Sequence, residues 1–515
     1  MTTSIEQLRR DAKALKKSHD AGDRAAWVRV NNYRPRPEGT ALKHADYLHV
    51  VAREQGFASW PHLKLAVETV GMDRAAKQQR LGIAVKNGQD WVVRAMLAED
   101  PDLPMGNMGL ACGLYLRDEV ARLIEADPGA ATRKAPLAPP LTILAQSKAI
   151  HMFPEREADM LAIADLLLSH GADVNVGVPV YEGNDHLLST LYFAVGHGDN
   201  MPLTLWLLEH GADPDDSESL YHATELGHHE GLRLLLAHGA DPKGTNALLR
   251  AMDFHDVEAV RLLLAAGAEV DEFNGAHVGG ERPWVVPSLH QAARRLAPVE
   301  MAEVLLEAGA STTREFEGVT PYSMARVYGN RGLASLLEAR GAATPLSREE
   351  ELLARAADGQ DSPGEDIDPA KLPEAYRALI RTLLHLPSDD MIGHLERLVA
   401  LGVPYDAPDA EGLTPVQIAG WEGLPEIMAY LLRLGPDLGH VNGYGGTLLS
   451  TIMHGSENNP NREGRDYVAC LKLALREGVA LPRRAIELAG AEDVAECLHD
   501  WAEAHPGQVV AHGVA

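Results

Sequence analysis

Histidine, which can bind metal ions or carry protons, is abundant in this sequence: 23 of its 515 residues are histidine. Converging imidazoles bind zinc or exchange protons near neutral pH. Several of these histidines, however, stand at recurring positions. Three directly precede Gly-Ala pairs, His170, His210 and His238, and the others are His197, His222, His228 and His290. We interpret the recurring ones as structural residues, and the rings of His222 and His290 could bridge neighbouring loops by hydrogen bonds. His186, His255 and His277 fall outside these positions and could converge on one site.

Carboxylates recur just after the same Gly-Ala pairs, at Asp173, Asp213, Asp241 and Glu269. Acid–base catalysis by two carboxylates requires both in one site, whereas these follow one another at whole-repeat distances. An aspartate at such a position accepts hydrogen bonds from the backbone of its own turn. The pattern therefore indicates turn formation and not catalysis.

The three cysteines, Cys112, Cys470 and Cys497, lie in apolar helical stretches without a neighbouring basic residue. A reactive thiol needs a nearby cation or a helix N-terminus to stabilise its thiolate, so we interpret the three as core residues. They are too few for a disulfide framework. The sequence also has no apolar run of about 18 residues that would span a membrane and no apolar signal segment at its start. We expect a cytoplasmic protein.

Sequence motifs of known catalytic sites are missing. The sequence contains no G-x-S-x-G turn, no P-loop, no H-E-x-x-H helix and no paired C-x-x-C. A glycine-rich phrase at 277–283 is not followed by the helix that a phosphate site requires. We therefore expect no catalytic residue, no cofactor and no metal, and we favour a non-enzymatic protein.

Regularly repeated helices must position all of these residues. Amphipathic stretches such as 164–175 and 203–216 each contain a helix that is ended by a glycine, Gly171 and Gly211. Glycine suits the positive φ that terminates many helices. A second short helix precedes most copies, and Thr-Pro opens the two clearest, at 320–326 and 414–420. The terminal glycine recurs nine times, at Gly171, Gly211, Gly239, Gly267, Gly309, Gly341, Gly402, Gly435 and Gly478.

This order of helix, turn, helix, glycine and polar loop resembles the ankyrin-repeat family, whose repeat of about 33 residues contains T-P-L-H-x-A. The resemblance covers roughly residues 80–505 and is strongest at 160–345. It implies an all-α solenoid of stacked helix pairs that binds another protein through its concave face and its inter-repeat loops.

The intervals between the nine glycines depart from the period of the family. They measure 40, 28, 28, 42, 32, 61, 33 and 43 residues. The two 28-residue steps predict shortened loops with little or no β-hairpin. The 61-residue interval predicts an additional helix pair, formed by 372–386 and a helix that begins near Asp389. Long insertions lie between repeats at 176–187 and 272–287, and within repeats at 147–160 and 455–466.

These patterns divide the chain into six predicted regions. They are an N-terminal helical cap at 1–72, degenerate ankyrin-like helix pairs at 73–160, well-formed repeats at 161–346, a helix with an acidic linker at 347–371, divergent repeats at 372–505, and a tail at 506–515. The cap is predicted to contain a helical stretch at 5–30 and two helices within 42–68. Part of it, 52–64, is similar to a lead-in found in bacterial ankyrin-repeat proteins. We expect the cap to shield the terminal hydrophobic face of the solenoid.

Charge and aromatic residues indicate what such a solenoid would bind. The 74 acidic and 47 basic side chains give a net charge of −27, which argues against nucleic acid and anionic membranes and favours a protein with basic patches. Aromatic and arginine side chains often anchor interfaces. The residues that we predict to bind a partner or ligand are Tyr181, His186, Phe273, His277, Arg282, Trp284 and Phe316.

An alternative hypothesis is a small-molecule-binding or catalytic site. It would form where the insertions 176–187 and 272–287 meet over the concave groove, with Tyr221 as a further contributor. Insertions that close over a pocket would favour this alternative, whereas insertions that stand apart beside an open groove would favour protein binding.

Overall fold

The computed structural model describes residues 4–37, 39–134, 138–179, 186–271, 286–386 and 388–511. The protein is 59% helix and 2% strand, so the predicted all-α fold is confirmed. Its chain forms two compact units. Unit 1 consists of Met1–Phe254 and Glu258–Val285, and unit 2 consists of His255–Val257 and Val286–Ala515.

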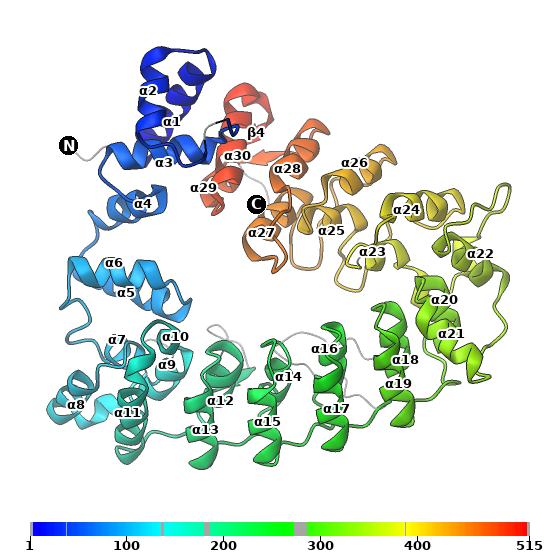
Figure 1. Ribbon diagram of the computed structural model, residues 1–515, viewed down its shortest axis with the longest axis horizontal. Helices are drawn as coiled ribbons and strands as arrows, with labels where there is room; N and C mark the ends of the chain where they lie inside the picture. Colours follow the sequence, from blue (N-terminus) through cyan, green and yellow to red (C-terminus); the bar gives the residue numbers. More distant parts are fainter. Residues whose placement is uncertain are drawn as a thin grey trace. The chain divides into compact units, whose positions relative to one another are not determined.

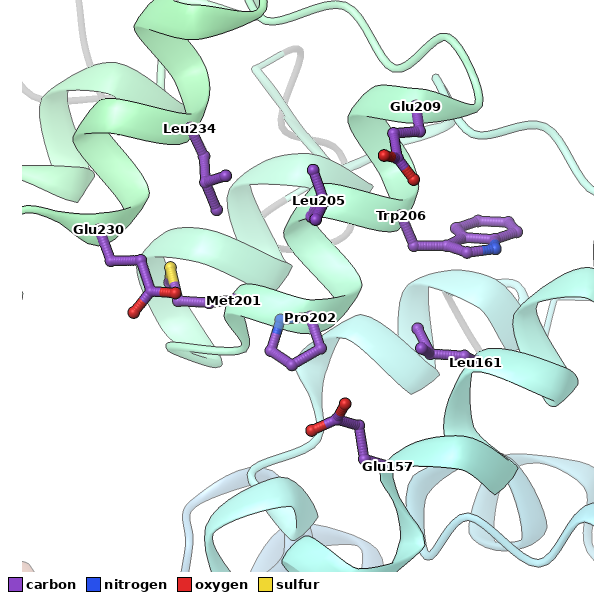
Figure 2. A pocket seen from close by; sticks show the side chains of 9 residues that line it. All are labelled: Glu157, Leu161, Met201, Pro202, Leu205, Trp206, Glu209, Glu230 and Leu234. Atoms are coloured by element: carbon purple, nitrogen blue, oxygen red, sulfur yellow. The ribbon is translucent and has the colours of Figure 1, made fainter.

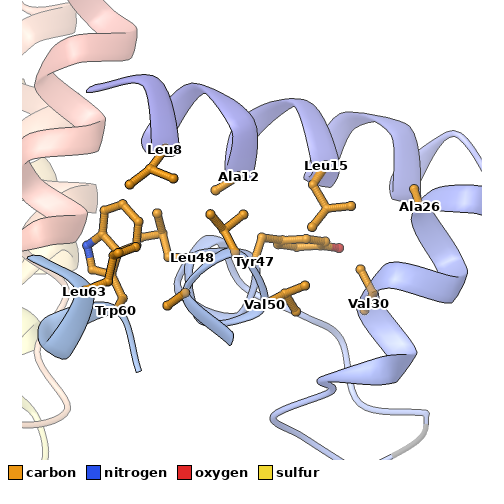
Figure 3. Packing of buried hydrophobic residues seen from close by; sticks show 12 residues of the cluster. Leu8, Ala12, Leu15, Ala26, Val30, Tyr47, Leu48, Val50, Trp60 and Leu63 are labelled. Carbon is orange, nitrogen blue, oxygen red and sulfur yellow. The ribbon is translucent and has the colours of Figure 1, made fainter. Parts of the chain in front are cut away.

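Unit 1 begins with four helices that share one core. They are α1 (Ile5–Asp20), α2 (Arg24–Asn32), α3 (His44–Glu54) and α4 (Trp60–Thr69). Figure 3 shows Leu8 and Leu15 of α1 packed over Tyr47 and Leu48 of α3. The single helical stretch expected at 5–30 is wrong, because Gly22 adopts a φ of 77° and the Asp23 carboxylate caps a new helix.

Six helix pairs follow in unit 1, each with a first and a second helix. The first helices are α5 (Arg74–Lys86), α7 (Met108–Gly113), α9 (Pro140–Gln146), α12 with η3 (Thr190–Tyr192 and Phe193–His197), α14 (Ser219–Ala223) and α16 (Ala247–Asp253). The second helices are α6 (Asp90–Glu99), α8 (Arg117–Ala126), α11 (Glu157–Ser169), α13 (Met201–Glu209), α15 (Glu230–Ala237) and α17 (Val257–Ala265). Successive first helices pack together, as do the second helices from α8 to α15, so the array has two layers (Figure 1).

Unit 2 continues the pattern with a different set of helices. They are α18 (Ser288–Arg294), α19 (Val299–Glu307), α20 (Pro321–Tyr328), α21 (Arg331–Ala339), α22 (Arg348–Ala357), α23 (Leu379–Leu383), α24 (Met391–Ala400), α25 (Pro415–Trp421), α26 (Pro425–Arg433), α27 (Leu448–Asn458), α28 (Tyr467–Arg476), α29 (Arg483–Leu488) and α30 (Glu492–Ala504). The pair α23–α24 is the additional one predicted within the 61-residue interval. A short parallel bridge joins β3 (Leu481–Pro482) to β4 (Val509–Val510).

Glycine ends the second helices as the sequence predicted. All nine glycines have positive φ, between 68° and 104°. Gly239, after α15, has a φ of 94°, a conformation that a β-branched side chain strongly disfavours. The Thr-Pro starts are confirmed too. Thr320 forms a capping box at the beginning of α20, and at the beginning of α25 the Gln417 side chain accepts a hydrogen bond from the N–H of Thr414 at 3.2 Å.

Loop length follows the glycine spacing. The 40-residue interval contains an antiparallel hairpin of β1 (Gly177–Pro179) and β2 (Leu187–Ser189). The loops of the two 28-residue steps, 212–218 and 240–246, are fully described and contain no strand. These loops are therefore short, as predicted. The hairpin of β1 and β2 lies at the predicted long insertion 176–187.

Candidate functional site

The candidate site lies along the layer of first helices in unit 1. We call its outer side the first-helix face, formed by α5, α7, α9, η3, α14 and α16. Two features stand on it: a network of buried charges around α14, and a groove between α5, α7 and α9.

Glu218 is the centre of the charge network. It stands at the N-cap of α14 and its side chain is fully buried. The carboxylate of Asp216 fixes this helix start by accepting hydrogen bonds from the backbone N–H groups of Glu218 and Ser219, at 3.0 and 2.7 Å. Two imidazoles reach Glu218: His186 Nε2 lies 2.7 Å from Oε1 and His222 Nε2 lies 3.2 Å from Oε2. The insertion 176–187 is thus tied to α14 at its end.

A second carboxylate extends the network towards the next repeat. Glu225 Oε2 lies 2.9 Å from His222 Nδ1, and its Oε1 accepts hydrogen bonds from Arg250 Nε at 2.7 Å and Nη2 at 2.6 Å. The Arg250 guanidinium also lies over the rings of Tyr221 and Phe254, 5.5 and 4.8 Å from their centroids. Three consecutive repeats are therefore joined by one chain of charges.

Burial alone would lower the pKa of His222. Hydrogen bonds and charges from Glu218 and Glu225 outweigh that effect and raise the pKa to about 9. Burial likewise favours the neutral form of Glu225, yet contacts with His222 and Arg250 leave its pKa below the usual value. At neutral pH His222 and Arg250 are therefore positive and Glu225 is negative. Such mutual compensation is typical of a structural ion network, because each buried charge has a partner.

No group of three or more histidine, cysteine or carboxylate side chains that could hold a metal ion occurs within the described ranges. Tyr192, whose ring lies 4.8 Å from that of His222, has its pKa raised to about 12 by burial and so stays protonated. The network offers a site for charge compensation, and nothing in its geometry points to bond-making chemistry.

The groove on the first-helix face is largely apolar. It has a volume of about 650 Å³ and is lined by α5, α7, α9 and the residues that flank them. Three glycines, Gly82, Gly109 and Gly113, lie on this lining, and a Cβ at each would meet a side chain of a neighbouring helix at 3.4 to 3.7 Å. Ile83 projects from α5 and is 47% exposed, an unusual position for a large aliphatic side chain. Leu110 and Ile143 line the same groove.

Most of the predicted site residues lie outside the described ranges. These are Tyr181, Phe273, His277, Arg282 and Trp284, so their roles and the alternative pocket stay predictions. His186 contacts Glu218, as described above. Phe316 is in unit 2, half-buried, with its ring 5.8 Å from that of His290. Tyr221, named for the alternative, lies on α14 beside Arg250.

Several histidines at recurring positions contact the backbone, whereas His222 and His228 contact carboxylates instead. His170, His210 and His238 each contact the carbonyl oxygen four residues earlier through Nδ1, at 2.9, 2.7 and 2.8 Å. In unit 2, His290 Nε2 lies 3.0 Å from the carbonyl oxygen of Val319 and links two repeats. His255 Nε2 lies 2.8 Å from the carbonyl oxygen of Arg295.

The carboxylates after Gly-Ala are turn residues, as predicted for three of them. Asp173, Asp213 and Asp241 each accept a hydrogen bond from the backbone N–H two residues later, at 2.9, 3.0 and 3.0 Å. Asp215 further accepts the N–H of Asp241 at 2.7 Å and so joins neighbouring loops. The three cysteines are buried core residues: burial raises the pKa of Cys112 to about 12, and that of Cys470 to the same value.

Sequence reasoning missed Glu218, Glu225 and Arg250. One signal was readable, because Glu218 and His222 stand four residues apart in SESLYHATELG and therefore share a helix face. The link from Arg250 to Glu225 joins different repeats, and that from His186 to Glu218 crosses from the hairpin to α14, so the stacking had to be known first.

Unit 2 has two half-buried basic side chains that contact carboxylates, Arg381 on α23 and His385 just after it. Arg381 Nη2 lies 2.5 Å from Asp409 Oδ2, and His385 Nδ1 lies 2.9 Å from Glu422 Oε1. Burial lowers the pKa of Arg381 although Asp409 opposes this effect. Charge pairing between neighbouring repeats is thus a recurring device in this protein.

Comparison with known proteins agrees with the repeats seen in the structure. A family model of ankyrin repeats, in three copies, matches residues 191–274. This match supports the predicted ankyrin repeats for residues 191–274, and the helix pairs with terminal glycines on either side follow the same pattern. Ankyrin repeats are generally protein–protein interaction modules.

Two similar solved structures are ankyrin repeat domains. That of human ASB11 is 21% identical, with a TM-score of 0.33 and an alignment covering 50% of this chain and 100% of that one. That of Bcl-3, described as a unique member of the IkappaB protein family, is 20% identical, with a TM-score of 0.34 and coverage of 45% and 99%. Among curated proteins, none matches the chain. Across the described ranges, the helices are either too short or too polar to cross a membrane.

Proposed function

We propose that this protein is a non-enzymatic binding solenoid that recognises a protein with basic patches through its first-helix face and inter-repeat loops. The observation that carries the proposal is the groove of about 650 Å³ between α5, α7 and α9, with Ile83 exposed at its side. Exposed apolar surface that is rimmed by polar residues is typical of interaction sites. We propose this face as the counterpart of the concave face expected from the sequence.

A second anchor lies further along the same face. Phe254, at the end of α16, is 51% exposed, and the Arg250 guanidinium stacks on its ring. Because Glu225 holds Arg250 in place, the aromatic ring is presented without further ordering of its neighbour. Rigid aromatic and arginine side chains are the residues that contribute most to binding energy at interfaces.

Negative charges along the loops favour a basic partner. Asp173, Asp213, Asp215 and Asp241 are exposed at the loop edge while one oxygen of each accepts a backbone hydrogen bond. Their positions are therefore fixed and their charge faces solvent. A row of fixed carboxylates attracts a positively charged surface and speeds its association.

Affinity capture with the full chain, followed by purification of the captured protein and titration, tests the proposal. We expect Ile83→Glu and Phe254→Ala to raise Kd by about tenfold or more, since each removes a contact at an anchor. Val441→Glu is the matched control, because Val441 is 48% exposed and lies in a loop of unit 2; its Kd should stay within about twofold.

The same titration at increasing salt separates the contributions. Kd should rise with salt if the loop carboxylates steer a basic partner. Binding that is unchanged by both Ile83→Glu and Phe254→Ala would exclude the first-helix face as the binding surface. A partner that binds independently of salt would contradict its basic character.

A further inference from the structure

A second groove lies on the opposite layer of unit 1, which we call the second-helix face. It is formed by α11, α13 and α15 and has a volume of about 360 Å³. Its floor is apolar: Met201 and Trp206 are buried, and Leu161, Leu205 and Leu234 are half-buried. Figure 2 shows the apolar side chains of three consecutive second helices grouped around the same space.

The rim of this groove is acidic. Glu157 of α11, Glu209 of α13 and Glu230 of α15 are exposed, and Figure 2 shows their carboxylates on different sides of the apolar floor. Within the described part of the chain, no basic side chain pairs with any of these three carboxylates. Their charge is therefore compensated by solvent alone in the unbound protein.

Basic residues near the groove are scarce and engaged elsewhere. Neither α11 nor α13 contains a lysine or arginine. Arg233 of α15 lies 2.8 Å from Glu258, and Arg156, just before α11, donates to the carbonyl oxygen of Leu114 at 2.9 Å. The groove consequently combines an apolar floor with a net negative rim.

The floor is fixed before any partner binds. Trp206 Nε1 donates a hydrogen bond of 2.8 Å to Asp165 of α11, and the indole stacks on His210 with their centroids 4.1 Å apart. These contacts hold the largest side chain of the groove in one position. A preformed apolar surface binds with a smaller loss of conformational entropy.

We propose that the groove of the second-helix face binds an amphipathic, positively charged helix of another protein. Apolar side chains of that helix would cover Leu161, Leu205 and Leu234, and its lysine or arginine side chains would pair with Glu157, Glu209 and Glu230. A helix with an apolar stripe flanked by basic residues meets both demands at once, because residues three and four apart share a face.

Among the described helices, α1 and α28 both combine a net positive charge with an apolar face. The apolar residues of α28, such as Leu471 and Leu475, are buried in unit 2. The apolar residues Leu8, Ala12 and Leu15 of α1 are buried in the N-terminal core, as Figure 3 shows. Helix α1 of a second copy therefore has no free apolar face to offer. The proposal is also independent of the first-helix face, since the two grooves share no residue.

A synthetic peptide tests this proposal directly. The probe is a fluorescein-labelled peptide of about 18 leucine and lysine residues at helical spacing, long enough to form a helix on binding. A second peptide with glutamate in place of lysine serves as the charge control. Binding to the full chain is followed by fluorescence anisotropy at about 150 mM salt, where exposed charges are partly screened.

Two triple variants with the same change in net charge locate the binding. The combination Glu157→Lys, Glu209→Lys and Glu230→Lys reverses the rim, and we expect it to weaken the binding of the lysine peptide by about tenfold or more. The matched control reverses three exposed glutamates of unit 2: Glu303→Lys, Glu307→Lys and Glu351→Lys. The control should change Kd by less than about threefold, the effect of net charge alone.

Hydrogen exchange gives a second readout that does not depend on variants. Bound peptide should slow amide exchange in α11, α13 and α15 and leave α5, α7 and α9 unchanged. Equal weakening by both triple variants, or no protection of the three second helices, would overturn the proposal. So would self-association that the rim reversal abolishes, because the occupant would then be a second copy.

Discussion

Charged residues on the two faces of unit 1 differ in burial and in pairing, although the same repeats form both faces. On the first-helix face, Glu218, His222, Glu225 and Arg250 are buried or half-buried and each contacts an opposite charge. On the second-helix face, Glu157, Glu209 and Glu230 are exposed and pair with no basic side chain among the described residues. Burial requires a partner for each charge, whereas solvent does not. The first set therefore stabilises the stack, and the second is available for binding.

The largest expected effect of this difference concerns Glu218. Glu218→Ala leaves His222 and His186 without their shared carboxylate, and removal of one partner of a buried pair costs about 3–5 kcal/mol. Urea unfolding, combined with hydrogen exchange in α14, measures the loss. Glu209→Ala on the other face is the control and should change stability by less than about 0.5 kcal/mol. Similar losses of stability in both variants would contradict the inferred difference between the two faces.

The next effect is a dependence on pH that belongs to one face alone. The pKa of His222 is raised from 6.5 to about 9 in the folded protein. A raised pKa contributes stability that is complete below the unfolded value and is lost as pH rises through the folded value. We therefore expect the wild type to lose on the order of 3 kcal/mol between pH 6 and pH 10 through this group.

Substitution separates this contribution from other titrating groups. His222→Gln should remove that part of the pH dependence, and His210→Gln should retain it, because His210 lies on the second-helix side and contacts a backbone carbonyl. The measurement is urea unfolding at several pH values for the three proteins. Identical slopes for wild type and His222→Gln would reject the assigned protonation of His222.

A substitution at the end of a second helix is expected to have an intermediate effect on the free energy of unfolding. Gly239 follows α15 with a φ of 94°, and a Cβ added there would meet no atom within 4 Å, so backbone strain is the main cost. Gly239→Val should destabilise the protein by about 1–3 kcal/mol. Thermal unfolding measures the loss, and Gly507→Val, at a glycine with open space and no positive φ, is the control. An unchanged melting temperature for Gly239→Val would reject the conformational argument.

The smallest effect is expected for the rim of the second-helix groove. The combined reversal Glu157→Lys, Glu209→Lys and Glu230→Lys should change the free energy of unfolding by less than about 1 kcal/mol, because exposed charges contribute little to stability. Thermal unfolding at low and high salt checks this. A large loss would show that these carboxylates stabilise the fold, as those of the first-helix face do.

Much of the fold could be predicted because each repeat carries its own local signals. The glycines that end second helices, such as Gly171, have a positive φ. A glycine directly after an amphipathic stretch is a local sequence signal for such a helix end. The break between α1 and α2 was missed although Gly22 and Asp23 are local signals of the same kind. Helical spacing on both sides of these residues concealed the turn.

The candidate site was less accessible to sequence reasoning. Ile83 lines a groove that α5, α7 and α9 form together, and such a groove depends on how successive helices stack. The Glu225–Arg250 contact likewise joins residues 25 positions apart. Tyr405, in the loop between α24 and α25, donates its hydroxyl to the carbonyl oxygen of Leu434 at 2.7 Å, 29 positions later in the chain. Local patterns predict helix ends well and contacts between repeats poorly.

Because the three thiols are buried, the rate at which a reagent modifies them reports local opening of the surrounding helices. Cys112 belongs to unit 1, whereas Cys470 and Cys497 belong to unit 2, and all three are buried. A thiol reagent can modify each one only when the surrounding helices separate. The labelling rate at each cysteine therefore measures how often that end of the array opens, and a bound partner that clamps one end should slow the reaction there alone.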